Sequence, residues 1–256
     1  MSIPQNLNNI KSQLPEHVTL VAVSKTKPVS DLMEAYNAGQ RIFGENKIQE
    51  MVDKHEQMPN DVQWHMIGHV QRNKVKYMAE FVSLIHGVDS FKLLKEINKQ
   101  AKKHDRVINC LLQIKIASED SKFGMTTEEA RDILTSEAFK ELKNIKVVGL
   151  MGMATFTDDD TQLQKEFRLL KTVFDEFKIQ NSEFKIISIG MSSDYKLAID
   201  CGSTMVRIGS SILMWLTNGL SSKNCITVVI RKMMIINGIV DISLLYEKLK
   251  DEVNIN

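Results

Sequence analysis

The stretch VTLVAVS at residues 18–24 is an almost unbroken run of apolar or small side chains. A strand that is covered on both faces has such a run, whereas a half-exposed strand alternates apolar and polar residues. Seven further short apolar runs follow along the chain. They are RIFGE (41–45), VQWHMIG (62–68), LIHGV (84–88), VINCLLQIKI (107–116), KVVGLMGM (146–153), KIISIGM (185–191) and MVRIG (205–209). Together these runs predict eight buried, parallel strands.

Amphipathic segments separate the predicted strands and indicate helices. Ser30 is expected to cap the helix DLMEAYNA, which stops at Gly39, and Thr126 opens a capping-box pattern. A first helix is expected at about residues 3–13. Eight strands separated by helices over about 210 residues describe an α/β fold, a single (β/α)8 barrel of the TIM type. An open doubly wound sheet is the alternative.

Length, charge and hydropathy exclude several classes of protein. A chain of 256 residues suits one large α/β domain. Its 33 basic and 32 acidic side chains give a net charge of +1, so no nucleic-acid partner is expected. No apolar run approaches the ~18 residues that a membrane span needs, and the first residues do not form a secretory signal. We therefore expect a soluble, cytoplasmic protein without a membrane partner.

Neither the cysteines nor the histidines predict a metal site. The three cysteines are far apart and form no C-x-x-C pair, which argues against both a zinc site and a disulfide framework. His65 and His69 are four residues apart, a spacing that aligns two ligands on a helix. Here they lie across a strand end and a glycine, and no H-E-x-x-H pattern occurs.

Polar residues stand repeatedly where a predicted strand ends, which is where barrel enzymes place their chemistry. Lys25 follows the first strand directly, and Asn46 follows the second. A lysine held at such a position would be partly desolvated, which would lower its pKa and favour the neutral amine that attacks a carbonyl. Taken alone, this segment favours the simpler alternative of a solvated lysine at the start of a loop.

The segment GMSSDYKLAIDCGSTMVRIGSS at residues 190–211 predicts an anion site. Ser192 precedes a short helix, while Gly209 and Ser210 follow the eighth strand. The loops after the seventh and eighth strands form the recurrent phosphate site of such barrels, and helix starts offer free N–H groups. A serine helix cap followed by a glycine turn is the simpler alternative.

Arg207 lies inside the eighth predicted strand. A charged side chain there must either pair, with Asp200 or Glu45 as candidates, or point toward a ligand. A lysine, a phosphate cradle and a buried arginine together indicate a ligand that carries an aldehyde and a phosphate. Pyridoxal 5'-phosphate (PLP) is the leading candidate, and a Schiff-base aldolase is an alternative.

Eight segments resemble the YggS/PROSC family of PLP homeostasis proteins. They are VAVSKTKP (21–28), IFGENKIQE (42–50), WHMIGHVQRNK (64–74), HGVDS (86–90), KFGM (122–125), GLMGMAT (149–155), IGMSSDYKLAI (189–199) and GSTMVRIGSSI (202–212). The resemblance spans residues 1–212, and it implies a barrel like the N-terminal domain of alanine racemase, a PLP protein of fold type III. Residues 213–256 depart from the family pattern; they are an atypical tail, either the last barrel helix or an addition.

The resemblance implies a role for each candidate residue. Lys25 forms the Schiff base with PLP, Ser192, Gly209 and Ser210 hold the phosphate, Arg207 faces the pyridine nitrogen, and Asn46 lines the ring pocket. It implies a monomer that buffers or carries PLP, with PLP-dependent apoenzymes as candidate partners and without strong catalytic turnover. An amino-acid racemase that depends on PLP is the alternative function.

Overall fold

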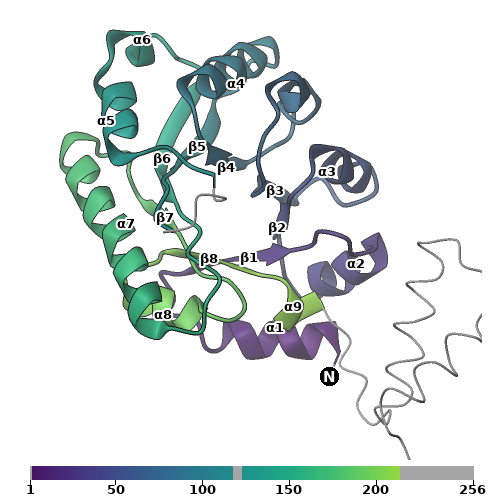
Figure 1. Ribbon diagram of the computed structural model, residues 1–256. Helices are drawn as coiled ribbons and strands as arrows, with labels where there is room; N and C mark the ends of the chain where they lie inside the picture. The colour runs from purple at the N-terminus through teal and green to yellow at the C-terminus, as the bar shows by residue number, and fades with distance from the viewer. Residues whose placement is uncertain (1, 118–122, 214–256) are drawn as a thin grey trace, which may run out of the picture. The chain divides into compact units, whose positions relative to one another are not determined.

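Eight parallel strands close into a barrel in the order of the sequence (Figure 1). The computed structural model describes residues 2–117 and 123–213. Strand β1 pairs with β2 on one side and with β8 on the other, so the ring is complete. Helices surround the strands on the outside (Figure 1). The predicted (β/α)8 barrel is confirmed, and an open doubly wound sheet is excluded.

Each strand is short and most are followed by a helix. The strands are β1 (Thr19–Val23), β2 (Ile42–Glu45), β3 (Gln63–Met66), β4 (Leu84–Val88), β5 (Ile108–Gln113), β6 (Ile145–Met151), β7 (Ile186–Ser188) and β8 (Met205–Ile208). The helices are α1 (Ile3–Lys11), α2 (Val29–Asn37), α3 (Ile48–His55), the 3-10 helix η1 (Arg72–Tyr77), α4 (Phe91–Lys103), α5 (Thr127–Thr135), α6 (Glu137–Lys140), α7 (Asp160–Gln180), α8 (Tyr195–Asp200) and α9 (Ser210–Leu213).

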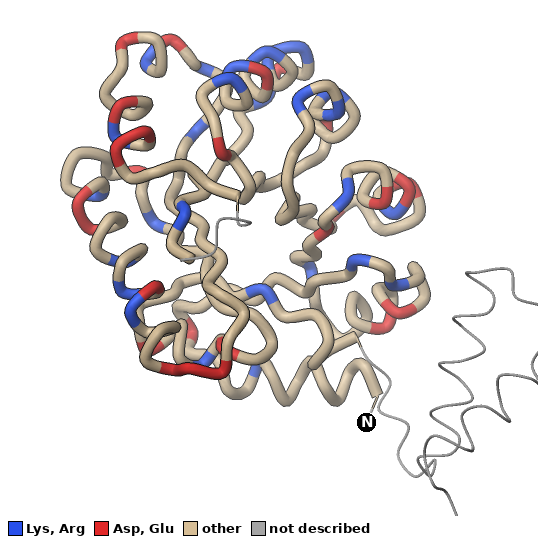
Figure 2. Tube along the Cα trace, viewed as in Figure 1, with Lys and Arg blue, Asp and Glu red and all other residues tan. Residues whose placement is uncertain are grey.

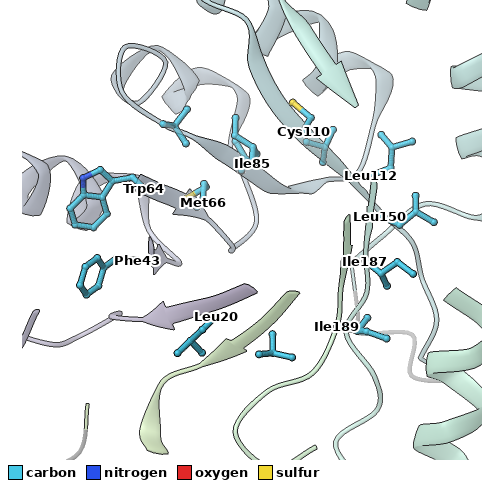
Figure 3. Close-up of a cluster of buried hydrophobic side chains, with 14 of the residues drawn as sticks. Leu20, Phe43, Trp64, Met66, Ile85, Cys110, Leu112, Leu150, Ile187 and Ile189 are labelled. Carbon is cyan, nitrogen blue, oxygen red and sulfur yellow. The ribbon is translucent and has the colours of Figure 1, made fainter. Parts of the chain in front are cut away.

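Side chains along the strands alternate between two apolar clusters. Leu20 of β1 belongs to the outer cluster, which fills the space between strands and helices; Phe43, Trp64 and Leu150 lie in it too (Figure 3). Val21 belongs to the inner cluster within the ring. The other buried members of the inner cluster are Ile67, Leu84, Leu111, Met151 and Met205. Burial on both faces explains why the strands are continuously apolar, since each large apolar side chain contributes about 1.5–3 kcal/mol.

Several predicted boundaries differ by a few residues from those observed, and two of the differences have a clear physical reason. Helix α2 begins at Val29 with Pro28 as its N-cap, and not at Ser30, because the fixed φ of proline suits the start of a helix. Strand β7 ends at Ser188 and not at residue 191, because Gly190 has a φ of 95° and turns the chain. The Thr126 capping box is confirmed.

No helix among the described residues is long and apolar enough to cross a membrane. Both signs of charge are spread over the outer helices around the ring (Figure 2). The tail predicted at 213–256 lies outside the described residues, except for Leu213 at the end of α9.

Candidate functional site at the mouth of the barrel

A cavity of about 560 Å³ lies at the carboxyl ends of the strands. It is lined by all six residues that the sequence predicted for the site: Lys25, Asn46, Ser192, Arg207, Gly209 and Ser210. Lys25 and Arg207 bring positive charge to the cavity, and no described lining residue is a carboxylate. The cavity therefore favours an anionic ligand.

Lys25 stands two residues beyond the end of β1. Its side chain is exposed, so the predicted partial desolvation is wrong for this structure. The physical reason is that the strand ends at Val23, and Lys25 begins the exposed turn that follows the buried Ser24. The amine is accessible at the rim of the cavity, where an aldehyde could reach it.

The turn that follows Lys25 is held in an uncommon conformation. Thr26 has a φ of 62°, a region in which a residue other than glycine is strained by about 1–3 kcal/mol. Its N–H donates to Glu50 Oε1 at 2.5 Å, and the N–H of Lys27 donates to the Ser24 carbonyl oxygen at 3.0 Å. These two hydrogen bonds fix the backbone on the C-terminal side of Lys25.

A buried ion-pair network anchors this turn to the barrel. Lys54 Nζ lies 2.7 Å from each of three acceptors, namely Glu45 Oε1, Glu50 Oε1 and the Ser24 carbonyl oxygen. Ser24 Oγ also donates to Glu45 Oε1, at 2.6 Å. Burial raises the pKa of Glu45, while Lys54 and Ser24 oppose that shift. Sequence reasoning missed this network, although the i,i+4 spacing of Glu50 and Lys54 on α3 was a signal for part of it.

The loops after β7 and β8 meet at one end of the cavity. Ser192 Oγ accepts a hydrogen bond from the N–H of Gly209 at 3.4 Å, and Asp194 Oδ1 accepts one from the N–H of Met191 at 2.5 Å. Within the described ranges, the backbone N–H groups of Ser192, Ser193 and Ser210 have no protein acceptor. Free N–H groups beside hydroxyls are the donors that a phosphate needs, so this end of the cavity suits a phosphate.

Arg207 is buried beneath the cavity. Its guanidinium donates to the Ser188 carbonyl oxygen and to Ser188 Oγ, both at 2.7 Å, and to the Gly152 carbonyl oxygen at 3.0 Å. Among the described residues, neither Asp200 nor Glu45 is its partner: the guanidinium binds oxygens of Ser188 and Gly152, and Glu45 binds Lys54. Burial lowers the pKa of Arg207 to about 10, and the charge of Asp194 opposes this shift. The side chain therefore stays charged at neutral pH.

A chain of buried polar groups continues inward from Arg207. Ser188 Oγ lies 3.0 Å from His86 Nδ1, and His86 Nε2 lies 3.0 Å from His65 Nδ1. Burial lowers the pKa of His65 to about 3, and that of His86 well below its ordinary value. Both imidazoles are consequently neutral. Sequence reasoning missed His86, although a histidine inside the apolar run LIHGV was a visible signal.

His65 and His69, which are four residues apart in the sequence, do not face each other. His65 is buried against His86, whereas His69 lies 3.2 Å from Asp89. In the part of the chain that the structure describes, no group of three or more histidine, cysteine or acidic side chains is placed to hold a metal.

The two buried histidines predict a stability that decreases as the pH falls. The unfolded chain takes up protons on them below about pH 6.5, while the folded protein does not until far lower pH. The free energy of unfolding is thus retained above about pH 6.5. Below that pH it falls by up to about 1.4 kcal/mol per pH unit for each histidine. Urea denaturation at about pH 7.5 and about pH 5.5 measures this loss. We expect a smaller loss for His65→Gln; an identical loss would contradict this account.

One broad class of protein domain matches most of this chain. The family described as "Alanine racemase, N-terminal domain" matches residues 2–216. A solved alanine racemase of Clostridium difficile 630 is 17% identical to this chain, with a TM-score of 0.68. The superposition covers 85% of this chain and 57% of the racemase, and it shows that the two share a fold.

Closer relatives narrow the class to one family. A pyridoxal phosphate homeostasis protein of Vibrio alginolyticus is 40% identical, over 82% of this chain and 96% of the relative. A pyridoxal phosphate homeostasis protein of Escherichia coli (strain K12) is 38% identical, over 77% of this chain and 86% of the relative. The structure of PipY of Synechococcus elongatus PCC7942 "with PLP bound" has 32% identity and a TM-score of 0.76, covering 83% of this chain and 100% of PipY. The chain belongs to the family of pyridoxal phosphate homeostasis proteins.

Proposed function

We propose that this chain binds PLP as a Schiff base on Lys25 and acts in PLP homeostasis as a buffer or carrier, without strong catalytic turnover. The observation that carries the proposal is the single cavity that joins an accessible lysine amine to a set of free N–H donors. PLP has an aldehyde at one side of its ring and a phosphate at another, so it matches both features. The PLP-bound structure of PipY supports this assignment.

Each lining residue has a defined task in this proposal. Ser192 and Ser210 bind the phosphate with hydroxyl and N–H donors, Gly209 lets the backbone approach it closely, and Asn46 contacts the ring. Arg207 faces the pyridine nitrogen. The guanidinium stays protonated and can only donate hydrogen bonds. It therefore cannot accept a hydrogen bond from a protonated ring nitrogen, which favours the unprotonated form of that nitrogen. Bound PLP supplies an electron sink, which an unprotonated nitrogen weakens, and this restrains turnover.

The proposal extends to the setting of the protein. We extend the proposal to a cytoplasmic monomer that hands PLP to PLP-dependent apoenzymes, and membership of the PLP homeostasis family supports the part of it that concerns PLP supply. A racemase of amino acids is the second candidate, which the shared fold with alanine racemase favours. The racemase chains are much longer, since this chain covers 57% of the one from Clostridium difficile 630.

Titration of the purified protein with PLP tests the proposed function. We expect visible absorption that saturates at one PLP per chain, as a Schiff base gives. Exchange of the α-proton of alanine or serine in heavy water, followed by NMR, separates the two candidate functions. Slow or absent exchange supports the carrier, fast exchange supports the racemase, and a colourless protein contradicts both.

Arg207→Gln tests the role given to the arginine. Glutamine keeps a hydrogen-bond donor but removes the positive charge, so the ring nitrogen can take up a proton more easily. We expect the visible spectrum of the PLP-loaded protein to change and to depend on pH in a new range. Arg131→Gln is the matched control, because Arg131 pairs with Glu176 on the outer surface, and it should leave the spectrum unchanged. Equal spectra for all three proteins would contradict the assignment.

A further inference from the structure

The mouth of the barrel holds an oriented histidine that has no part in the function proposed above. His69 follows β3 and Asp89 follows β4, and His69 Nδ1 lies 3.2 Å from Asp89 Oδ2. The side chain of Asp89 is 19% exposed and that of His69 is 44% exposed, so the carboxylate is the more buried partner and the imidazole the more accessible one. His69 lines the same cavity as Lys25.

An aromatic ring limits the orientation of this imidazole. Phe123 stacks on His69 with 4.5 Å between the ring centroids and 19° between the planes, and it also lines the cavity. Gln113 Nε2 donates to the carbonyl oxygen of Phe123 at 2.9 Å, which ties the aromatic residue to the end of β5. His69 is therefore held from two sides, by a carboxylate at Nδ1 and by a ring against its face.

This arrangement leaves one nitrogen available for proton transfer. A carboxylate beside Nδ1 keeps the proton on that nitrogen and leaves Nε2 as the basic atom. Imidazole is the side chain that both accepts and donates protons near neutral pH. Among the described lining residues, His69 is alone in having such a group, because the others are amides, hydroxyls, apolar side chains, Lys25 and the permanently charged Arg207.

Attachment of an aldehyde to a lysine needs proton transfer at two atoms. The amine nitrogen forms a bond to the carbonyl carbon and gives up its protons, while the carbonyl oxygen takes up protons and leaves as water. Release runs the same steps backward, with one water consumed. No electrons are gained or lost, so no further reactant is required beyond water.

We propose that His69, oriented by Asp89, is the general acid and base that accelerates both the loading of PLP onto Lys25 and its release. This role rests on the function proposed above. For a buffer or carrier, fast exchange is as necessary as tight binding. General acid–base groups accelerate reactions by about 10²–10⁴-fold.

Kinetics and equilibrium together test this role with His69→Gln. Stopped-flow absorbance after mixing with PLP gives the loading rate, and absorbance after dilution of the loaded protein gives the release rate. Because a catalyst cannot shift an equilibrium, we expect both rates to fall by the same factor, about tenfold or more. The dissociation constant of PLP should stay unchanged. Asp89→Asn should lower both rates in the same way, through misorientation of the imidazole.

The control is His104→Gln, since His104 caps α4 and does not line the cavity. Its rates should equal those of the unchanged chain. Unchanged rates in His69→Gln would overturn the proposal. A changed dissociation constant with only one rate altered would also overturn it, because His69 would then be a binding contact. If the unchanged chain develops no visible absorption with PLP, the proposed function itself fails, and that outcome is distinct from normal loading of the His69→Gln protein.

Discussion

Lys25→Ala protein remains colourless when PLP is added, whereas the unchanged chain develops visible absorption. Lys25 is the amine that stands at the rim of the cavity with the free N–H groups, so its removal should eliminate the proposed covalent bond and leave only contacts to phosphate and ring. We expect complete loss of the visible band and a loss of PLP affinity of at least about 100-fold, or roughly 3 kcal/mol. Absorbance and equilibrium dialysis measure the two effects.

Lys27→Ala is the matched control for this experiment. Lys27 is close in sequence to Lys25, yet it does not line the cavity. Its replacement should leave both the band and the affinity unchanged. A visible band of full strength in Lys25→Ala would place the reactive amine elsewhere and would contradict the site assignment.

Lys54→Met should destabilise the protein by about 3–5 kcal/mol, because it removes one partner of a buried ion pair. The side chain of Glu45 is fully buried, and Glu45 Oε2 has no hydrogen-bond partner among the described residues. Without Lys54, Glu45 must remain as an unpaired buried charge or take up a proton. Urea denaturation gives the change in the free energy of unfolding.

Two further variants make this prediction specific. Lys171→Met removes an exposed i,i+4 pair with Asp175 and should cost less than about 1 kcal/mol. Adding Glu45→Gln to Lys54→Met should recover part of the lost stability, because the neutral amide no longer needs a cation. Because Lys54 also binds the Ser24 carbonyl oxygen, we expect Lys54→Met to weaken PLP binding through the Lys25 turn. A cost equal to that of Lys171→Met would contradict the anchoring role.

The fold could be predicted from local pattern because burial on both faces leaves a direct trace in the sequence. Runs such as VTLVAVS are apolar at both Leu20 and Val21, and the structure places these two residues in different clusters. Strand ends were less predictable. Gly190 stops β7 through a backbone conformation that apolar content does not reveal.

The residues of the candidate site could be predicted from the sequence, but their hydrogen-bond and ion-pair partners could not. Lys25 and Arg207 could be assigned to one cavity because barrel topology brings strand ends together. The partners of Arg207 could not be foreseen, since they are mainly backbone carbonyl oxygens and carry no side-chain signature. The pairing of Glu45 with Lys54 depends on how α3 packs against β2, which only the three-dimensional arrangement reveals.

Borohydride reduction of the PLP-loaded protein, followed by peptide mapping, tests the central claim most directly. Reduction converts the Schiff base to a stable amine bond and so marks the lysine that carries PLP. The account predicts a single label, on the peptide that contains Lys25. A label on Lys27, on Lys54 or on any other lysine, or a loaded protein that takes up no label, would contradict it.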